Sequence, residues 1–343
     1  MSDVTRHVIA VDGMGGDNAP KSVIQGLSQF GDSGVHFLIY GNETELKPFA
    51  EQFLKNVSYE IRHTDVKVAS DMDVLSALRV GKSSSMGQAI NAVKSGEAEA
   101  VISAGNTGLY MALAKIILKT AEGIDRPAIA SFVPGKKGSS ICLDLGANAE
   151  CTVKNLIDFA IMGEALARVM FDKKDVSVAL LNIGSEDVKG NKLVKQTAEV
   201  LKQLFDHYAG FVEGNDINKG EVDVIVSDGF VGNVYLKTME GTAKYIVSEL
   251  KDALSESFFS KIGALLALPA LNHLKQKMDP RLYNGAILVG LNGVVVKSHG
   301  GTDDVGFAAA VRFTINTLRE NILIRIKEQL EKSKLHYNPG ETK

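Results

Sequence analysis

The chain has 343 residues, of which 45% are hydrophobic and 23% are charged, and this balance excludes a disordered chain, a collagen-like fibre and a coiled coil. Its 38 Lys and Arg residues and 41 Asp and Glu residues give a net charge of −3, which argues, together with the absence of Trp, against a nucleic-acid partner. Two cysteines cannot supply a disulfide framework or a four-cysteine zinc site, so we expect no metal.

The N-terminal stretch MSDVTRHVIAVDGMGG does not have the basic stretch, apolar core and small-residue cleavage site of a secretory signal. The sequence also has no uninterrupted apolar run of about 18 residues, the length needed for a transmembrane helix. We therefore expect a cytoplasmic protein with reduced thiols. Cys142 lies in an apolar run and Cys151 has no His nearby in the sequence, so neither is expected to act as a nucleophile.

Short apolar runs rich in β-branched residues alternate with longer stretches of helical periodicity. The runs predict strands at Val8–Val11, Val35–Tyr40, Val101–Ser103, Ile141–Leu145, Val178–Asn182, Val222–Ser227 and Val294–Lys297. Helices are predicted at Lys21–Phe30, Gly87–Ser95, Tyr110–Lys119, Lys154–Val169, Lys192–Phe205 and Val234–Leu254. This alternation predicts a doubly wound, mostly parallel sheet covered by helices on both faces. The length suits either two domains or one large α/β domain, and we expect the latter, a three-layer α/β/α fold over residues 1–343.

Turns rich in Gly, Asn and Asp follow most of the predicted strands, at Asp12–Asp17, Ser103–Gly108, Asp144–Asn148, Asn182–Asn191, Ser227–Asn233 and Ser298–Asp303. Glycine lets a backbone approach a ligand closely, and the helix that follows presents unpaired N–H groups. If these turns line one edge of the sheet, they form a crevice rich in donors, and the simplest ligand is phosphate. The alternative is that Gly and Asn only form turns.

Lys189, in the turn Gly184–Asn191, is the strongest candidate for a catalytic cation. A lysine just beyond a strand end can point into the crevice and bind phosphate or stabilise an oxyanion. Asn233, in the turn Asp228–Asn233, offers an amide donor to a developing oxyanion. The alternatives are a solvated loop lysine and a helix N-cap.

The turns at Asp12–Asp17 and after Ser298 are further candidates for phosphate binding. The first is glycine-rich but matches neither the dinucleotide fingerprint nor the Walker A motif. Its carboxylates would repel a bare phosphate, so we expect them to accept backbone N–H bonds, and we expect Asn18 to cap the following helix. His299 is either a phosphate ligand or a hydrogen-bonded structural histidine.

The segment Ser257–Met278, SFFSKIGALLALPALNHLKQKM, interrupts the alternation of strands and helices. Its apolar run is too short to span a bilayer. Apolar residues flanked by lysines fit a buried core helix, a dimer contact or an interfacial membrane anchor, and the residues alone leave all three open.

A series of short motifs runs along almost the whole chain: Asp12-x-Met14-Gly15-Gly16-Asp17-x-Ala19-Pro20, Ser84-Ser85-Met86, Ser103-Ala104-Gly105-Asn106-Thr107-Gly108, Gly123-Ile124-Asp125-Arg126-Pro127-Ala128, Asp144-x-Gly146-Ala147-Asn148, Asn182-x-Gly184-x-Glu186-x-x-Lys189-Gly190-Asn191, Asp228-Gly229-Phe230-x-Gly232-Asn233 and Lys297-x-His299-Gly300. Together they closely resemble the bacterial phosphate acyltransferases of phospholipid synthesis, the acyl-acyl carrier protein:phosphate acyltransferases. Gly13 stands where Ala is usual and Asn18 where His is common, so no role of that His is carried over.

The resemblance implies the fold of phosphotransacetylases and isocitrate-dehydrogenase-type enzymes, assembled as a homodimer. It also implies a peripheral membrane protein whose protruding helices carry an apolar tip, which we expect at residues 245–280 and which favours the membrane contact over the buried helix. The implied reaction transfers a fatty acyl group from acyl carrier protein to inorganic phosphate without a cofactor. The product, an acyl phosphate, would serve a downstream glycerol-3-phosphate acyltransferase in phosphatidic acid synthesis.

On this chain we assign Lys189 and Asn233 as the catalytic pair. Substrate or phosphate binding is expected at Gly15, Gly16, Asn106, Thr107, Gly108, Asn148, Gly232, His299 and Gly300. Contacts with the carrier protein or the membrane are expected at Phe258, Phe259, Lys261, Leu265, Leu266, Leu268, Lys275 and Lys277. Because such carrier proteins are acidic, the basic surface that meets them is expected at Lys261, Lys275, Lys277 and Arg281.

Other functions stay open on the sequence. A short-chain phosphotransacetylase that uses acyl-coenzyme A would share the fold and the anion chemistry. A metal-dependent decarboxylating dehydrogenase would need clustered acidic ligands and a nicotinamide site, and the sequence suggests neither. A membrane-associated scaffold would explain Ser257–Met278 but not the Gly- and Asn-rich turns.

Overall fold

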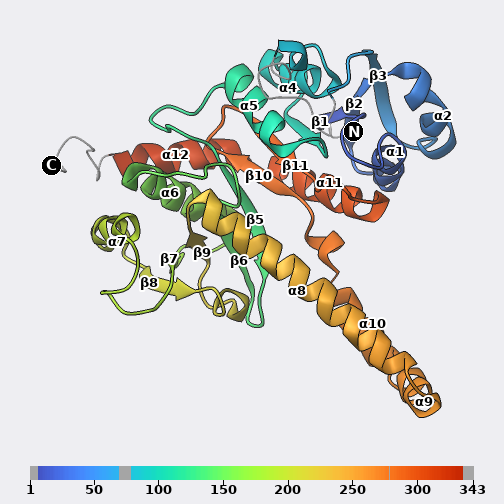
Figure 1. The fold of residues 1–343 in the computed structure, drawn as a ribbon. Helices are drawn as coiled ribbons and strands as arrows, with labels where there is room; N and C mark the ends of the chain where they lie inside the picture. The colour runs from blue at the N-terminus through green and yellow to red at the C-terminus, as the bar shows by residue number, and fades with distance from the viewer. Residues whose placement is uncertain (1–6, 69–78, 278, 335–343) are drawn as a thin grey trace.

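A sheet of 11 strands runs through the computed structural model, which describes residues 7–68, 79–277 and 279–334 (Figure 1). In spatial order the strands are β3 (Ser58–His63), β2 (Val35–Gly41), β1 (His7–Asp12), β4 (Ala100–Ser103), β11 (Val294–Lys297), β10 (Ala286–Val289), β5 (Ala128–Pro134), β6 (Ser139–Leu143), β9 (Val224–Val226), β7 (Val178–Asn182) and β8 (Tyr208–Glu213). Most neighbouring pairs are parallel, as predicted.

Helices cover both faces of this sheet because its strands are apolar on both faces. In β1, Ile9 and Val11 point into one core and Ala10 into the other. The first core packs against α1 (Lys21–Leu27), α2 (Glu43–Phe53), α6 (Val153–Met170), α7 (Lys192–Leu204), α11 (Asp304–Arg319) and α12 (Ile322–Lys334). The second packs against α4 (Ser85–Ser95), α5 (Thr107–Leu118) and α8 (Gly229–Ser255). The predicted α/β/α fold is confirmed.

Every strand and helix predicted above is present, with end shifts of a few residues. Helices α9 and α10 fall in the helical segment expected at residues 245–280, and the helices and strands that were not predicted are α2, α11, α12, β3, β5, β8 and β10. β3 and β8 are the two edge strands, and their partly exposed polar residues hide the apolar pattern. β5 and β10 pair antiparallel with their neighbours and so do not follow the β–α–β pattern.

The expectation that all the Gly- and Asn-rich turns line one edge of the sheet is wrong. Between β11 and β6 lie three successive antiparallel pairings, β11 with β10, β10 with β5, and β5 with β6. An odd number of such pairings reverses the strand direction. The carboxyl ends of β1, β4 and β11 therefore lie at one edge, and those of β6, β7 and β9 at the other.

Helix α8 connects the two edges. It begins at the carboxyl end of β9 and packs on the sheet through Tyr235, Leu236 and Met239. Farther along, Lys237 and Lys244 lie close enough to His299, after β11, to lower the pKa of its imidazole. Figure 1 shows α8 running diagonally along the molecule. The helix therefore crosses from the turns of one half of the sheet to those of the other.

Beyond the sheet, the far end of α8 continues into α9 (Phe258–Leu266) and α10 (Leu268–Lys277), which extend away from the rest of the chain (Figure 1). The described residues within 245–280, the segment expected to protrude, comprise the end of α8, the helices α9 and α10, and the start of a short 3₁₀ turn. Within the described residues, the longer helices all fall short of the apolar length that a bilayer crossing requires.

Candidate active site

Lys189 lies in a compact turn after β7. Its side chain is exposed, while the amide of Asn182 donates to the carbonyls of Gly184 (3.1 Å) and Lys189 (3.3 Å) across the turn. The backbone N–H of Lys189 also donates to the carbonyl of Glu186 at 3.0 Å. Asn182 therefore fixes the backbone that carries the lysine, a role that the sequence indicated only by the Asn182-x-Gly184 motif.

Asn233 lies inside α8, the helix that follows β9, and β9 is the strand next to β7. The turn predicted at Asp228–Asn233 is the helix start, because the carboxylate of Asp228 caps it by accepting from the N–H of Val231 at 2.8 Å. The N-cap alternative for Asn233 is therefore wrong. The side chain of Asn233 is exposed and lies beside Gly146, where a Cβ would be 3.4 Å from the Asn233 Cβ.

Asp144 organises the turn after β6. Its buried carboxylate accepts from the backbone N–H groups of Ile129, Gly146, Ala147 and Asn148 and from the amide of Asn148. Burial raises its pKa, and these hydrogen bonds oppose the rise. The amide of Asn148 also donates to the carbonyl of Pro127 at 2.8 Å. Both amide hydrogens of Asn148 thus serve the turn rather than a phosphate.

Asp12 has the same role at the opposite edge. Its buried carboxylate accepts the hydroxyls of Ser85 and Ser103, both at 2.6 Å, and the N–H of Met14 at 3.3 Å. Burial raises its pKa, and the two serines oppose the rise. The expectation that Asp12 holds its turn by accepting hydrogen bonds is confirmed. Gly15 is required here, because a Cβ would lie 2.3 Å from the Asp12 carboxylate.

The turns after β1, β4 and β11 form one contiguous group. The N–H of Asp17 donates to the carbonyl of Gly300 at 2.9 Å, and Gly16, with a φ of +105°, packs against the same carbonyl. The amide of Asn18 donates to the carbonyl of Thr302 at 3.0 Å. Asn18 therefore ties two turns together, and the expectation that it caps α1 is wrong, since α1 has no side-chain cap.

Asn106, Thr107 and Gly108 form the start of α5 in this group. Asn106 is the N-cap, and its side chain accepts from the N–H of Leu109 at 3.0 Å. The cap, Thr107 and Gly108 are exposed at the end of the helix that carries its positive dipole. This helix start can receive an anion.

His299 follows β11 with its ring orientation fixed. The N–H of Gly301 donates to its Nδ1 at 3.2 Å, and its own backbone N–H donates to Asn284 at 3.0 Å. Since Nδ1 accepts, the neutral ring carries its hydrogen on Nε2. Partial burial, followed by the charge of Lys237, lowers the pKa of His299 below 6.5, so the ring is neutral at pH 7.

Lys297, the last residue of β11, is a buried residue that sequence reasoning did not select as a site. Only 8% of it is exposed, and its Nζ donates to the carbonyl of Ser298. Burial lowers its pKa to about 8, although the carboxylates of Asp12 and Asp17 oppose this. The sequence feature that could have identified it is its position directly after the apolar run Val294–Val296, where a buried charge is unusual.

The predicted site residues thus fall into two groups. Lys189, Gly232 and Asn233 lie with Asn148 at the carboxyl ends of β6, β7 and β9. The remaining phosphate candidates, Gly15, Gly16, Asn106, Thr107, Gly108, His299 and Gly300, lie at the carboxyl ends of β1, β4 and β11. Helix α8 connects the groups, because it carries Asn233 in its second turn and Lys237, one turn farther along, interacts with His299.

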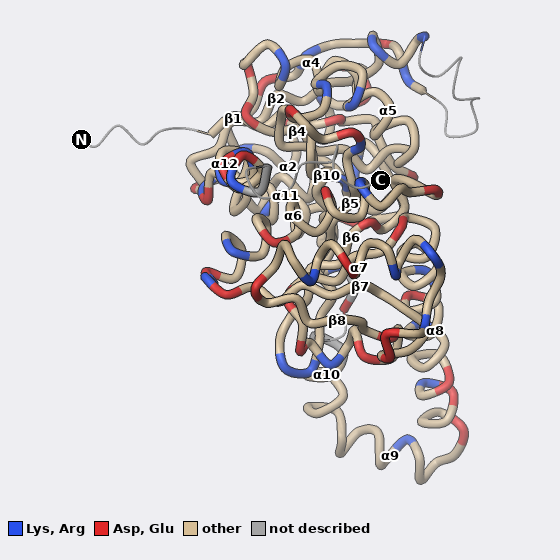
Figure 2. The backbone as a smooth tube through the Cα atoms, turned by 90° about the vertical axis from the view of Figure 1, so that its left-hand side faces the viewer, with Lys and Arg blue, Asp and Glu red and all other residues tan. Residues whose placement is uncertain are grey.

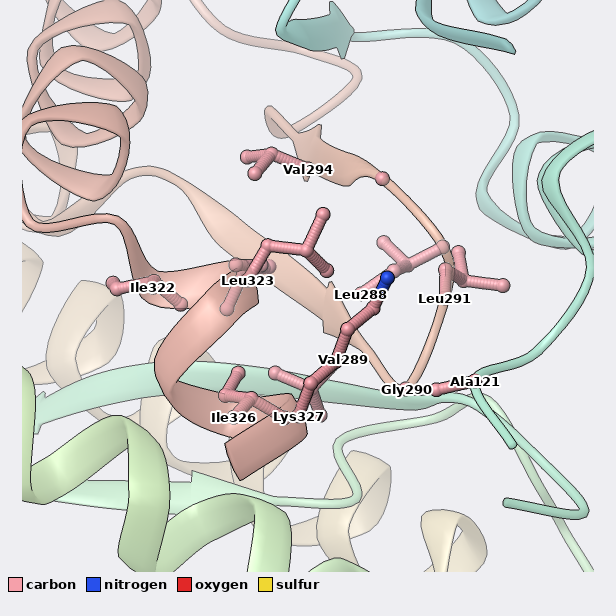
Figure 3. Close-up of a pocket in the computed structure, with 12 residues that line it drawn as sticks. Ala121, Leu288, Val289, Gly290, Leu291, Val294, Ile322, Leu323, Ile326 and Lys327 are labelled. Carbon is pink, nitrogen blue, oxygen red and sulfur yellow. The ribbon is translucent and has the colours of Figure 1, made fainter. Parts of the chain in front are cut away.

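Two cavities among the described residues lie away from both groups. The first, between α12 and the β10–β11 hairpin, is an apolar gap of about 10 Å³ lined by residues such as Leu288, Val289 and Ile326 (Figure 3). It is too small for a substrate. An open groove of about 690 Å³ lies beside α4 and includes Arg62, His63 and Lys94.

The arm formed by α9 and α10 presents apolar side chains to solvent. Phe258, Phe259, Leu265, Leu266 and Leu268 are exposed, with exposed fractions between 47% and 82%. The interpretation of this segment as a buried core helix is therefore wrong for the single chain. Lys261 is the one charged residue of α9, and most of this helix is drawn as uncharged in Figure 2.

The basic residues expected beside the arm differ in their surroundings. Lys261 is exposed, whereas the guanidinium of Arg281 pairs with Asp279 at 2.7 Å and with Asp303 at 2.8 Å. The charge of Arg281 is therefore already balanced. Lys275 and Lys277 belong to α10, and their side chains lie outside the described residues.

Among the described residues, no cluster of three or more His, Cys, Asp or Glu side chains could hold a metal ion. Burial raises the pKa of Cys142 to about 12 and that of Cys151 to about 11. Both thiols are therefore protonated at pH 7 and are poor nucleophiles.

Comparisons with known proteins agree over nearly the whole chain. The sequence model of a family described as "Fatty acid synthesis protein" matches residues 7–325. A phosphate acyltransferase of Parvibaculum lavamentivorans is 48% identical over 330 residues, covering 94% of this chain and 91% of that protein. A phosphate acyltransferase of Rhodospirillum rubrum is 47% identical over 332 residues, covering 95% of each chain.

A solved structure of similar fold is a phosphotransacetylase from Streptococcus pyogenes. Its TM-score is 0.58 at 16% sequence identity, over 95% of this chain and 94% of that one. At this identity the likeness concerns the fold alone.

Proposed function

The chain belongs to the phosphate acyltransferase family, and from this premise we propose that it transfers a fatty acyl group from acyl carrier protein to inorganic phosphate. The products are an acyl phosphate and the free carrier protein. The observation that carries the proposal is the placement of Lys189 and Asn233 at the carboxyl ends of the adjacent parallel strands β7 and β9.

The reaction needs positioning and charge stabilisation more than acid–base catalysis. Phosphate attacks the carbonyl carbon of the thioester, a C–O bond forms, and the C–S bond then breaks. The carrier's thiolate leaves and takes up the proton that the phosphate loses. Because a thiol has a pKa of about 8.5, the thiolate leaves without strong acid assistance. No covalent enzyme intermediate is required, which agrees with the protonated state of both cysteines.

Lys189 and Asn233 supply that charge stabilisation. The exposed ammonium of Lys189 stabilises the negative charge that develops on the carbonyl oxygen during attack. The side-chain amide of Asn233 donates a hydrogen bond to the same oxyanion or to the phosphate. The turn fixed by Asn182 and the helix start fixed by Asp228 hold the backbones of both residues before substrate arrives.

Exposed apolar side chains next to this pair support a fatty acyl donor. Ile183 and Val188 flank Lys189 in its turn, with 81% and 76% of their surface exposed. Phe230 and Val234 flank Asn233 on α8, at 65% and 51%. An acyl chain that covers these side chains gains hydrophobic free energy, which an acetyl group would not.

The arm supports association with a membrane surface and with a second copy of the chain. Its exposed apolar residues form a tip that can enter the interface of a bilayer, and Lys261 can meet anionic headgroups or an acidic carrier protein. Tyr245, Ile246 and Leu250 continue the apolar surface along α8 and suit a homodimer contact. A membrane position would deliver the reactive product to a glycerol-3-phosphate acyltransferase that consumes acyl phosphate.

The test is a phosphate-dependent thioester-cleavage assay. The purified protein is mixed with a long-chain acyl carrier protein, with and without inorganic phosphate, and acyl phosphate is detected directly. Phosphate-dependent formation of acyl phosphate is the expected result. Turnover of short acyl-coenzyme A without turnover of the carrier protein would replace this proposal with a phosphotransacetylase, and no turnover of either by folded protein would favour a scaffold.

A further inference from the structure

Asp12, Ser103 and Lys297 form a row across three adjacent strands. Asp12 ends β1, Ser103 ends β4 and Lys297 ends β11, and Ser103 is the register partner of Lys297. The pairing of Val11 with Ile102 puts Asp12 opposite Ser103 in the same way. Residues in register on parallel strands point to the same face, so all three side chains point toward the layer of α4, α5 and α8.

The lysine of this row is a buried cation without a carboxylate in contact. The one hydrogen bond that the described residues give its Nζ is to the carbonyl of Ser298, and no carboxylate of theirs lies within salt-bridge distance. An ammonium can donate three hydrogen bonds, so part of its capacity is unused. Burying such a charge destabilises a fold unless something compensates it. The position therefore suits a cation kept for an anionic ligand.

The surroundings of Lys297 add hydrogen-bond donors and further positive charge. The turn Gly15–Gly16 and the N-terminus of α5 lie directly beside Ser103, and His299 presents an Nε2 hydrogen. Lys237 on α8 lies close enough to lower the pKa of both Lys297 and His299. The group therefore attracts a small, multiply charged anion with several acceptor oxygens.

We propose that Lys297 is a phosphate-binding residue, and that its buried ammonium, with the turns Gly15–Gly16 and His299–Gly300 and the N-terminus of α5, holds the inorganic phosphate that attacks the thioester. The identity of this ligand rests on the proposed function, in which inorganic phosphate is the small, multiply charged substrate.

Asp12 does not prevent phosphate binding. Both of its oxygens accept serine hydroxyls, and Ser103 separates it from Lys297 by one strand, so the two Cα atoms lie about 9 to 10 Å apart. At that separation the carboxylate partly balances the buried ammonium when the site is empty. It forms no salt bridge with the ammonium.

Helix α8 links this phosphate site to the catalytic pair. Lys237 lies four residues after Asn233, hence on the same face of α8 and about 6 Å farther along its axis. The face that carries the catalytic amide therefore continues toward Lys297 and His299.

The test is direct phosphate binding without an acyl donor, by calorimetry in phosphate-free buffer. Lys297→Met removes the charge and keeps an apolar stem of similar length. Lys94→Met, at an exposed lysine in the last turn of α4, is the matched control. We expect Lys297→Met to weaken phosphate binding about 10- to 100-fold and Lys94→Met to leave it unchanged. In steady state the KM for phosphate should rise while that for the donor stays the same.

Equal phosphate affinity and an equal KM for phosphate in Lys297→Met and wild type would overturn the inference. So would a rise confined to the KM of the donor. These outcomes leave the proposed function intact if the wild type still makes acyl phosphate. Conversely, a wild type that binds phosphate through Lys297 but makes no acyl phosphate supports the phosphate site and rejects the proposed function.

A second measurement needs no substitution and so decides the matter even if Lys297→Met does not fold. Phosphate affinity of the wild type should fall as the pH rises through about 8, where Lys297 loses its proton, although phosphate remains a dianion. The charged groups that interact with Lys297 or His299 are Asp12, Asp17, Lys237, Glu240 and Lys244, and Tyr110 interacts with Asp12. Burial raises the pKa of Tyr110 well above 10, and that of His299 lies below 6.5, so neither changes charge in this range. Constant affinity from pH 7.5 to 9.5 would reject the role of Lys297.

Discussion

Gly232, in the first turn of α8, packs directly on the backbone of Asp144, so that a Cβ at Gly232 would lie 1.9 Å from the Asp144 carbonyl oxygen. The same Asp144 organises the turn after β6 through its carboxylate. This contact sets how closely α8, and with it Asn233, approaches that turn. The predicted ligand role of Gly232 is thus accompanied by a structural requirement for glycine.

Gly232→Ala should therefore destabilise the protein by about 3 kcal/mol, because the added methyl group displaces the start of α8. The matched control is Gly241→Ala in the same helix, where a Cβ would meet no atom within 4 Å. That substitution should stabilise the helix by up to about 1 kcal/mol. Urea unfolding of the two variants measures both effects, and equal midpoints would contradict the packing argument.

Lys189→Ala should leave stability within about 0.5 kcal/mol of the wild type, because the side chain is exposed. Its turnover should fall by on the order of 10²- to 10³-fold, the usual effect of removing one group that stabilises an oxyanion. Lys192→Ala, at an exposed lysine that opens α7, should keep its activity. Near-full activity of Lys189→Ala would remove this residue from the mechanism.

Gly108 and Gly300 can be tested for a ligand role because the fold tolerates a side chain there. A Cβ would come no closer than 3.5 Å to another atom at Gly108 and 3.6 Å at Gly300. Gly108→Ala and Gly300→Ala should therefore keep the melting temperature of the wild type. If phosphate approaches these backbones, each variant should raise the KM for phosphate several-fold. Unchanged kinetics would indicate that both glycines only form the turn.

The pH dependence of stability should reveal the buried charge of Lys297. Its pKa is lowered from 10.5 to about 8 in the folded state, so between these values the unfolded chain binds more protons. The contribution of Lys297 to the free energy of unfolding therefore increases as the pH rises through this interval, and it is least favourable below pH 8. In phosphate-free buffer at pH 7, Lys297→Met should be more stable than the wild type by up to about 3 kcal/mol.

Denaturant unfolding of both proteins from pH 7 to 10.5 tests this prediction, since other groups titrate equally in both. The stability difference should shrink as the pH rises. A difference that does not change with pH would mean that Lys297 is not a buried charge.

The exposed tip of the arm should determine membrane binding. Phe259→Ser combined with Leu266→Ser should weaken sedimentation with anionic vesicles about 10- to 100-fold, because two large apolar side chains are lost from the contact. The fold should be unaffected, as both side chains are exposed. Ile324→Ser, at an exposed residue of α12, is the matched control. Equal sedimentation of all three proteins would contradict a membrane role for the arm.

The sequence predicted the elements whose pattern is local. Runs such as Val178–Asn182 are buried on both faces, and α6 and α7 have an apolar side that repeats every helical turn. The edge strand Ser58–His63 has no such pattern, because one of its sides meets water. Asn233 was placed in a turn, since Gly229 and Gly232 look like turn residues, whereas Gly232 is there so that a helix can pack closely.

What the sequence alone determined is therefore the alternation of strands and helices and the residue types at the strand ends, because both follow from short-range periodicity and turn chemistry. Only the tertiary structure decided which strand ends share an edge. Three antiparallel pairings in the middle of the sheet put the strand ends of its two halves at opposite edges. Helix α8 begins near Asn233 in one group of turns and runs toward Lys297 in the other. Strand pairing joins residues far apart in the chain by backbone hydrogen bonds that nearly every residue type can make. The order of the strands therefore cannot be predicted from local sequence patterns.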